Sequence, residues 1–217
     1  MKKIVLTALF GLTALSGFSQ VTWDVKAGMS LSNFTQMDGG AKIGYSVGVG
    51  MDYAFNETWS LQSGVNFTSK GTKESDYDDG MKEEAKIFSH YIDIPVLAAF
   101  KMPIKDNIKL VVNAGPYFSA GLGGKYDYNF EGYGIESKSG KEDLFTKANG
   151  QEKAMMKRFD MGLQYGVGTE INEHFLVNLT GQCGFLSPFN EPYKTVFSDD
   201  GKSPKNLSFI ISVGYRF

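Results

Sequence analysis

The side chains best suited to covalent chemistry in this chain are Ser89 and His90, which follow one another directly. A serine hydroxyl activated by a histidine base within hydrogen-bond reach can attack an acyl group. These two residues lie in a stretch that alternates like a β-strand, where adjacent side chains point to opposite faces. The second histidine, His174, falls in a predicted short turn at the far end of the strands. We therefore expect no catalytic residues and no enzymatic activity.

A second chemical candidate is the acidic stretch 71–84, which holds six carboxylates and two lysines. Clustered carboxylates favour hard divalent cations, but this stretch lacks the glutamate that the EF-hand pattern requires at its twelfth position. The favoured interpretation is a solvated loop without a metal. The glycines at 121, 123 and 124 end a predicted strand and open no helix, so they do not form a phosphate-binding loop. We expect no metal and no cofactor.

Composition excludes several classes of protein. The single cysteine, Cys183, rules out an internal disulfide and a Cys-based zinc site. A formal charge of −2 does not suit a nucleic-acid-binding protein. The 26 glycines, 14% aromatic residues and only six prolines suit an antiparallel barrel rich in glycine and aromatic residues.

The candidate residues named above must be positioned by segments in which apolar and polar residues alternate, one after the other. Such a pattern predicts strands with one apolar and one polar face. The eight segments are residues 21–33, 42–55, 59–68, 88–100, 108–122, 158–171, 175–186 and 207–217.

The connections between these segments also alternate in length. Three are short, at 56–58, 102–107 and 172–174; three are long and polar, at 69–87, 123–157 and 187–206. The remaining one, 34–41, is brief. Short turns at one end and long loops at the other are typical of outer-membrane barrels. The sequence therefore predicts an all-β fold: an eight-stranded antiparallel up-and-down transmembrane β-barrel with long extracellular loops and short periplasmic turns.

In such a barrel the apolar face meets lipid and the polar face lines the lumen. Eight strands leave an interior that side chains can fill, so charges of both signs are expected to pair inside a closed lumen. In particular, Arg158 and Asp160 are expected to pair at one level. The predicted lumen charges are Asp24, Lys26, Asp52, Asp93, Lys109, Arg158, Asp160, Glu170 and Arg216.

Both ends of the chain indicate export. Lys2 and Lys3 precede an apolar run and then small residues, which predicts a cleaved signal peptide over residues 1–19 and a barrel domain over 20–217. The apolar run is too short to span a bilayer comfortably. At the other end the sequence LSFIISVGYRF stops on an aromatic ring. We interpret Val213, Tyr215 and Phe217 as a signal for the barrel assembly machinery in the bacterial outer membrane.

Four aromatic residues stand among polar ones in the stretch 123–157. They are Tyr126, Tyr128, Phe130 and Tyr133. Exposed rings between polar residues suit contact with a partner. They would equally suit packing onto the barrel rim, and the sequence leaves both open.

The strand sequences resemble the porin-like outer-membrane β-barrel family that includes the PorT-type proteins. The resemblance rests on YIDIPVLAAF at 91–100, NAGPYFSAGLGG at 113–124, RFDMGLQYGVGTEI at 158–171, and the terminal SVGYRF. It implies an eight-stranded outer-membrane barrel, often labelled a porin without evidence of transport. One branch of the family is tied to secretion and gliding machinery.

The function expected from the sequence is a structural or interaction role through the extracellular loops, within an envelope or secretion complex. The expected partners are outer-membrane lipid and lipopolysaccharide, the assembly machinery during insertion, and other outer-membrane proteins; nucleic acid is not among them. Two alternatives stay open. One is a narrow passive channel for ions or small solutes. The other is a soluble, lipocalin-like barrel with an apolar interior.

Overall fold

The computed structural model describes residues 20–35, 40–78, 81–132, 135–147, 150–191, 193–196 and 202–217. The predicted signal peptide, residues 1–19, lies outside the described residues. Within the described part, no helix is long and apolar enough to cross a membrane. Nearly all of the described chain is β-strand, as the alternation predicts.

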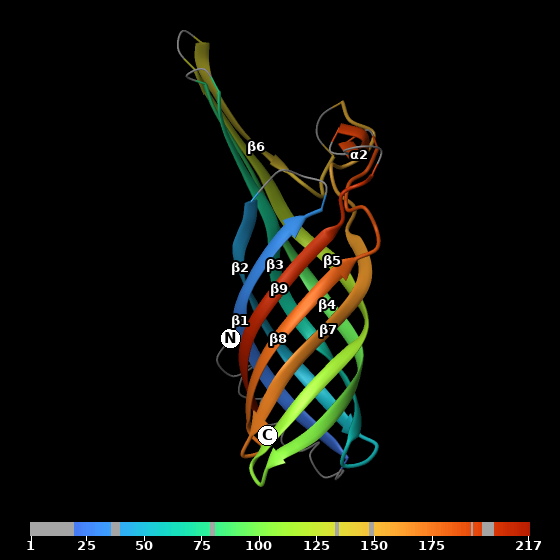
Figure 1. Ribbon diagram of the computed structural model, residues 1–217. Coiled ribbons are helices and arrows are strands. Elements are labelled where there is room, and N and C mark those ends of the chain that lie inside the picture. The colour runs from blue at the N-terminus through green and yellow to red at the C-terminus, as the bar shows by residue number, and fades with distance from the viewer. Residues whose placement is uncertain are drawn as a thin grey trace, which may run out of the picture.

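Eight strands form a closed antiparallel barrel (Figure 1). Each strand pairs with its neighbours in the order β4-β3-β2-β1-β9-β8-β7-β5, and a further pairing of β4 with β5 closes the ring. The ninth strand, β6, continues the sheet outside the ring by pairing with β5. The strands are β1 (Val21–Phe34), β2 (Gly40–Ala54), β3 (Trp59–Asp78), β4 (Met81–Lys105), β5 (Ile108–Gly132), β6 (Ile135–Asp143), β7 (Phe159–Ile171), β8 (Phe175–Gly184) and β9 (Asn206–Arg216).

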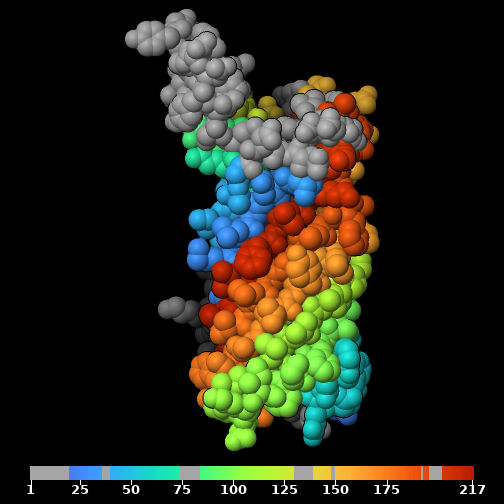
Figure 2. Space-filling model, in the orientation of Figure 1, coloured from blue at the N-terminus to red at the C-terminus, as the bar shows by residue number. Residues whose placement is uncertain are grey.

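The two faces of the barrel carry opposite chemistry. Along β9, Phe209, Ile211 and Val213 are 44–61% exposed, whereas Ser208, Ile210 and Ser212, at the alternate positions, are buried. The same alternation runs around the barrel, so apolar side chains cover its outside and polar ones fill its inside. Figure 2 shows the strands packed side by side as diagonal stripes around this outer surface. The lipocalin-like alternative, which required an apolar interior, is therefore wrong.

Three strands continue far beyond the barrel rim. The prediction that residues 69–87 and 123–157 are loops is wrong for most of both stretches, because β3, β4 and β5 extend through them and β6 adds a fourth strand. Figure 1 shows these strands leaving the barrel together as a protruding sheet, which we call the extension. Backbone pairing holds it, with Lys73 opposite Lys86 and Lys125 opposite Asp143.

Glycines let neighbouring backbones approach closely at the seam where β1 meets β9. A Cβ added to Gly28 would lie 2.1 Å from the carbonyl oxygen of Ile211. By contrast, a Cβ at Gly123, where β5 leaves the barrel, would have nothing within 4 Å. The seam therefore has a steric requirement for glycine that the base of the extension does not have.

Candidate functional site

The periplasmic end of the lumen holds a layer of paired charges, which we call the lower layer. Lys101 Nζ lies 2.9 Å and Arg216 Nη2 lies 3.4 Å from the same oxygen of Asp52. Arg216 also contacts Glu170 through its other terminal nitrogen. Four strands thus meet at a single ionic cluster.

Three of the predicted lumen charges, Asp24, Lys26 and Lys109, lie at the margin of this layer. Lys26 Nζ is 3.1 Å from the buried carboxylate of Asp24. Lys109 points toward the periplasmic mouth, where it lies 3.6 Å from Glu173 of the β7–β8 turn. Lys109 is therefore outside the cluster with which the sequence grouped it.

A second cluster, the upper layer, lies nearer the extracellular end. Lys70 Nζ is 3.0 Å from Asp93 Oδ1, and the two side chains are 1% and 0% exposed. Ser119 donates a hydrogen bond to the same carboxylate oxygen of Asp93. Above them, Lys70 Nζ lies 5.2 Å from the ring centre of Tyr91 and 5.1 Å from that of Tyr117, so two rings cover the ammonium group.

Asp160 completes the upper layer without the partner predicted for it. It accepts hydrogen bonds from Asn206 at 2.8 Å and from Tyr117 at 3.2 Å. Arg158, the predicted partner, is exposed at the rim, because β7 begins one residue later, at Phe159. Its guanidinium donates instead to the carbonyls of Gly121 and Leu122. The predicted Arg158–Asp160 pair is wrong.

Neutral amides separate the two charged layers. Along β7, Gln164 lies between Asp160 of the upper layer and Glu170 of the lower one, and it accepts a hydrogen bond from Gln182. Amide and hydroxyl side chains surround a cavity of about 70 Å³ at this level. That volume holds a few water molecules. It is well below the roughly 300 Å³ or more that a drug-sized ligand occupies.

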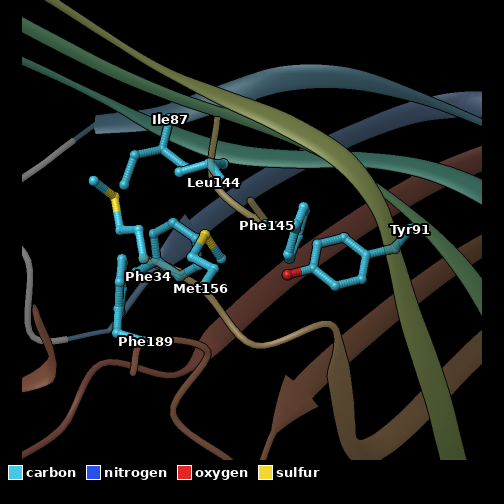
Figure 3. Close-up of a cluster of buried hydrophobic side chains, with 8 residues drawn as sticks. Phe34, Ile87, Tyr91, Leu144, Phe145, Met156 and Phe189 are labelled. Atoms are coloured by element: carbon cyan, nitrogen blue, oxygen red, sulfur yellow. The ribbon is translucent and has the colours of Figure 1, made fainter. Parts of the chain in front are cut away.

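An apolar cluster closes the barrel above the upper layer, and we call it the cap. Segments 144–147, 150–156 and 185–191 fold over the extracellular mouth and place Phe145 against Tyr91, with ring centres 5.9 Å apart (Figure 3). The backbone of Met156 donates to the carbonyl of Leu144, which fixes the two sides of the first segment together. The cap consists of Phe34, Ile87, Tyr91, Leu144, Phe145, Met155, Met156 and Phe189.

Asp143 fixes the start of the cap. Its carboxylate accepts a hydrogen bond of 2.9 Å from the backbone N–H of Phe145. Burial opposes the charged form of this carboxyl, but hydrogen bonds from Phe145 and Thr146 outweigh burial and lower the pKa of Asp143 below its ordinary value. The charged carboxylate therefore helps to hold Phe145 in place.

The extension carries ion pairs across its strands. Lys73 and Lys86 both contact Glu84, at 3.4 and 3.2 Å, and Lys141 lies 3.6 Å from Asp127. The acidic stretch 71–84 is thus part of a hairpin, and Glu84 is engaged by lysines. Within the described residues, no three His, Cys, Asp or Glu side chains are grouped to hold a metal ion.

Three of the four predicted interaction aromatics, Tyr126, Tyr128 and Phe130, lie on β5 where it continues into the extension. Tyr126 packs against the cap, and its ring lies 5.8 Å from that of Tyr128 on the same strand. Phe130 belongs to β5 by its backbone pairing with Glu83. Tyr133 lies outside the described residues. The contact of Tyr126 with the cap is packing within this chain, and a partner contact by these rings stays a prediction.

The three C-terminal residues predicted to guide assembly lie at the periplasmic end of β9 and just after it. Val213 and Tyr215 face outward, and the Tyr215 ring stacks on His174 with ring centres 5.4 Å apart. The backbone of Phe217 donates to the carbonyl of Trp23, so the last residue closes onto β1. Their role in assembly stays a prediction.

The Ser89 and His90 side chains lie on opposite sides of β4. Ser89 is buried inside and donates to the carbonyl of Lys70. His90 lies outside among rings, stacked on Phe67 with centres 5.3 Å apart. The alternation of the strand thus separates the hydroxyl from the imidazole.

Comparison with known proteins agrees with this architecture. A family model described as an outer membrane protein beta-barrel domain matches residues 16–190. No curated protein sequence matches the chain.

Several solved structures of outer-membrane barrels are similar over nearly their whole length. Ail of Yersinia pestis is 16% identical, with 91% of this chain and 98% of that chain covered and a TM-score of 0.37. OprG of Pseudomonas aeruginosa is 11% identical, covers 91% and 96%, and has a TM-score of 0.44. A major outer membrane protein of Thermus thermophilus is 12% identical, covers 91% and 99%, and has a TM-score of 0.45.

Proposed function

Because the chain belongs to the outer membrane protein beta-barrel domain family, and so resides in the bacterial outer membrane, we propose that it acts there as a closed anchor that presents its extension to other envelope or surface proteins. The barrel supplies the membrane anchor. The extension supplies the contact surface. The proposed contact surface therefore lies on strands in stretches for which the sequence predicted loops.

The observation that carries this proposal is the free backbone edge of the extension. Within the described residues, β6 pairs with β5 alone, and the part of β3 beyond Lys73 pairs with β4 alone. An unpaired edge presents a row of N–H and C=O groups that an extended segment of another protein can join. Two such edges project beyond the rim, where a partner can reach them.

The charges on the extension define which partners suit it. Glu84, Lys86, Asp127 and Lys141 line a hollow of about 220 Å³ on its surface. Charges of both signs favour a polar partner with complementary charges over an apolar one. Membership of a secretion or gliding complex, to which one branch of the resembled family is tied, belongs to the same proposal.

Shortening the extension without disturbing the barrel tests the proposal. Replacing residues 75–84 and residues 127–141 each with Asn-Gly joins Glu74 to Ala85 and Tyr126 to Glu142, which are already opposite one another. Asn-Gly suits a two-residue hairpin turn. Partners recovered by mild detergent purification from native membranes are expected to disappear from the shortened protein, while its heat-modifiable migration on gels shows a folded barrel. Equal recovery of partners with both proteins, or none with the full chain, would reject the proposal.

A narrow channel is less well supported. Two charged layers and the cap occupy the lumen at three levels, and the cavity between the layers holds only a few water molecules. A catalytic role has less support still, because Ser89 and His90 face opposite sides of β4.

A further inference from the structure

The outer face of β2, β3 and β4 carries a cluster of rings at its extracellular end. His90 lies at the centre, with its ring 4.5 Å from Phe88, 5.3 Å from Phe67 and 6.2 Å from Tyr45. Rings at this height on a barrel lie at the boundary between hydrocarbon and headgroups. We call these four residues the aromatic platform.

Lysines stand directly above the aromatic platform. The register of β2 shifts between Ala41 and Ser46, and near this shift the Lys42 side chain reaches across Gly71 until its ammonium lies 3.9 Å from the centre of the Phe88 ring. Lys125, on β5, is exposed and lies opposite Phe88 of β4 in the strand pairing.

These two lysines differ from their neighbours on the extension. Within the described residues, neither Lys42 nor Lys125 forms an ion pair with a carboxylate, whereas Lys73 and Lys86 share Glu84. Lys42 donates to the carbonyl of Ile87, and the charge of Asp127 acts on it from farther away. Two ammonium groups at the headgroup level are thus available to an anion.

An apolar groove of about 490 Å³ lies on the same outer face. Its walls are chiefly Val25, Val47, Val49, Val65, Phe67 and Ile92. Phe67 belongs both to the groove and to the aromatic platform, so the groove, the rings and the lysines form one continuous surface. From the membrane interior outward, that surface is apolar, then aromatic, then cationic.

We propose that this surface binds one molecule of phosphorylated lipid A from the outer leaflet. Its phosphate lies against Lys42 and Lys125, and one acyl chain fills the groove. Charge-assisted hydrogen bonds to phosphate are stronger than neutral ones. Lysines at a membrane surface attract anionic lipid headgroups. The order of chemistry along the surface matches an amphiphile with an anionic head and apolar tails.

A second copy of the chain fits this surface less well. Pairing two such faces would bring four ammonium groups together at the membrane boundary, where like charges repel. A dimer is therefore an outcome that the experiment must be able to detect.

The test measures lipid binding to the full protein purified in a mild detergent. Diphosphoryl lipid A is titrated into wild type and into Lys42→Gln, Lys125→Gln and the double variant, with binding read by native mass spectrometry. Each single change is expected to weaken binding about five-fold, and the double change about 25-fold. Lys157→Gln, an exposed lysine that precedes β7, is the matched control and is expected to bind as wild type does.

The groove is tested separately with bulky substitutions. Val47→Trp fills the groove and is expected to weaken lipid A binding, whereas Val177→Trp, at an equally exposed site on β8, is not. Heat-modifiable migration on gels confirms that each variant is folded.

Three results would overturn the proposal. The first is equal binding of phosphatidylglycerol or of dephosphorylated lipid A. The second is a double lysine variant with wild-type affinity. The third is a mass spectrum in which protein dimers replace the lipid adduct.

Discussion

Lys70 and Asp93 form the most deeply buried of the ion pairs between described residues. Removing two charges from water is costly, and their mutual attraction repays the cost only when other hydrogen bonds complete the site. Ser119 and Gln182 supply such bonds to Asp93, and the rings of Tyr91 and Tyr117 cover Lys70. The pair is therefore one unit whose halves depend on each other.

Substituting only one half of this pair is expected to be severe. Lys70→Met leaves Asp93 buried without its cation and is expected to lower the free energy of unfolding by about 3–5 kcal/mol. Lys70→Met combined with Asp93→Asn should recover much of that loss. Urea unfolding in lipid vesicles measures both.

Lys86→Met serves as the control for this experiment. Lys86 forms an exposed ion pair on the extension, so its loss should cost at most about 1 kcal/mol. The single variant Asp93→Asn completes the comparison. If the double variant loses as much free energy of unfolding as Lys70→Met and Asp93→Asn lose in sum, Lys70 and Asp93 do not act as a unit.

The sequence predicted most of the lumen charges by position but missed two lysines that neutralise them. Lys70 was missed because the alternation of β3 fades after Thr68, where no lipid-facing side is required. Lys101 was missed because it follows Phe100, the last residue of the predicted strand, although β4 itself continues to Lys105. Arg158 was misplaced because an alternating pattern does not define the first residue of a strand.

At the scale of elements, the seam between β1 and β9 decides whether the barrel closes. Gly28→Ala would bring its Cβ to 2.1 Å from the Ile211 carbonyl, so the strands must separate locally. We expect a loss of about 1–3 kcal/mol in urea unfolding. Gly123→Ala meets no atom within 4 Å and is expected to stay within about 0.5 kcal/mol of wild type. Equal losses for the two variants would mean that close packing at the seam is not limiting.

Loosening of the cap should be detectable with a protease added to intact cells, because the cap lies at the extracellular mouth. Phe145→Ala removes the ring that joins Tyr91 to the cap segments, a change that costs about 3–5 kcal/mol in a packed core. Local opening should make trypsin cleavage after Lys153 and Lys157 at least about ten-fold faster on intact cells. Phe159→Ala, at a 52% exposed position, is the control and should leave the rate unchanged. Unchanged cleavage of the Phe145 variant would show that the cap does not depend on this ring.

The extension and the cap are the two elements that the alternating pattern did not predict. Strands in lipid must alternate, so all eight barrel strands were predicted with their order and orientation. The outer parts of β3 and β4, and all of β6, are mostly polar and pair through their backbones, which leaves no alternation to detect. In the outer part of β5, Tyr126, Tyr128 and Phe130 do alternate with polar residues, but this pattern was interpreted as aromatic residues within a loop. In the sequence, the stretch 123–157 gives two hints of the cap. They are the apolar pairs Leu144–Phe145 and Met155–Met156, whose sequence neighbours are mostly polar.

At the scale of the whole molecule, two charged layers and the cap oppose passage through the barrel. Purified protein in planar bilayers is therefore expected to give no large, stable conductance. Phe145→Ala combined with Met156→Ala should loosen the cap and still give no conductance, because both charged layers remain beneath it. A large stable conductance in wild type would favour the channel, and one in the double variant alone would make the cap the gate.

The length of β4 and β5 has a mechanical consequence. Each is 25 residues long and runs from the periplasmic turn into the extension, a span of about 80 Å at the usual rise per residue. A tensile load on the extension would act parallel to these strands and be shared across the ladders that β4 makes with both of its neighbours. Such a load shears many hydrogen bonds at once, whereas a perpendicular force would break them one after another. A partner pulling on the extension would thus be resisted by the strand pairing along the full height of the barrel.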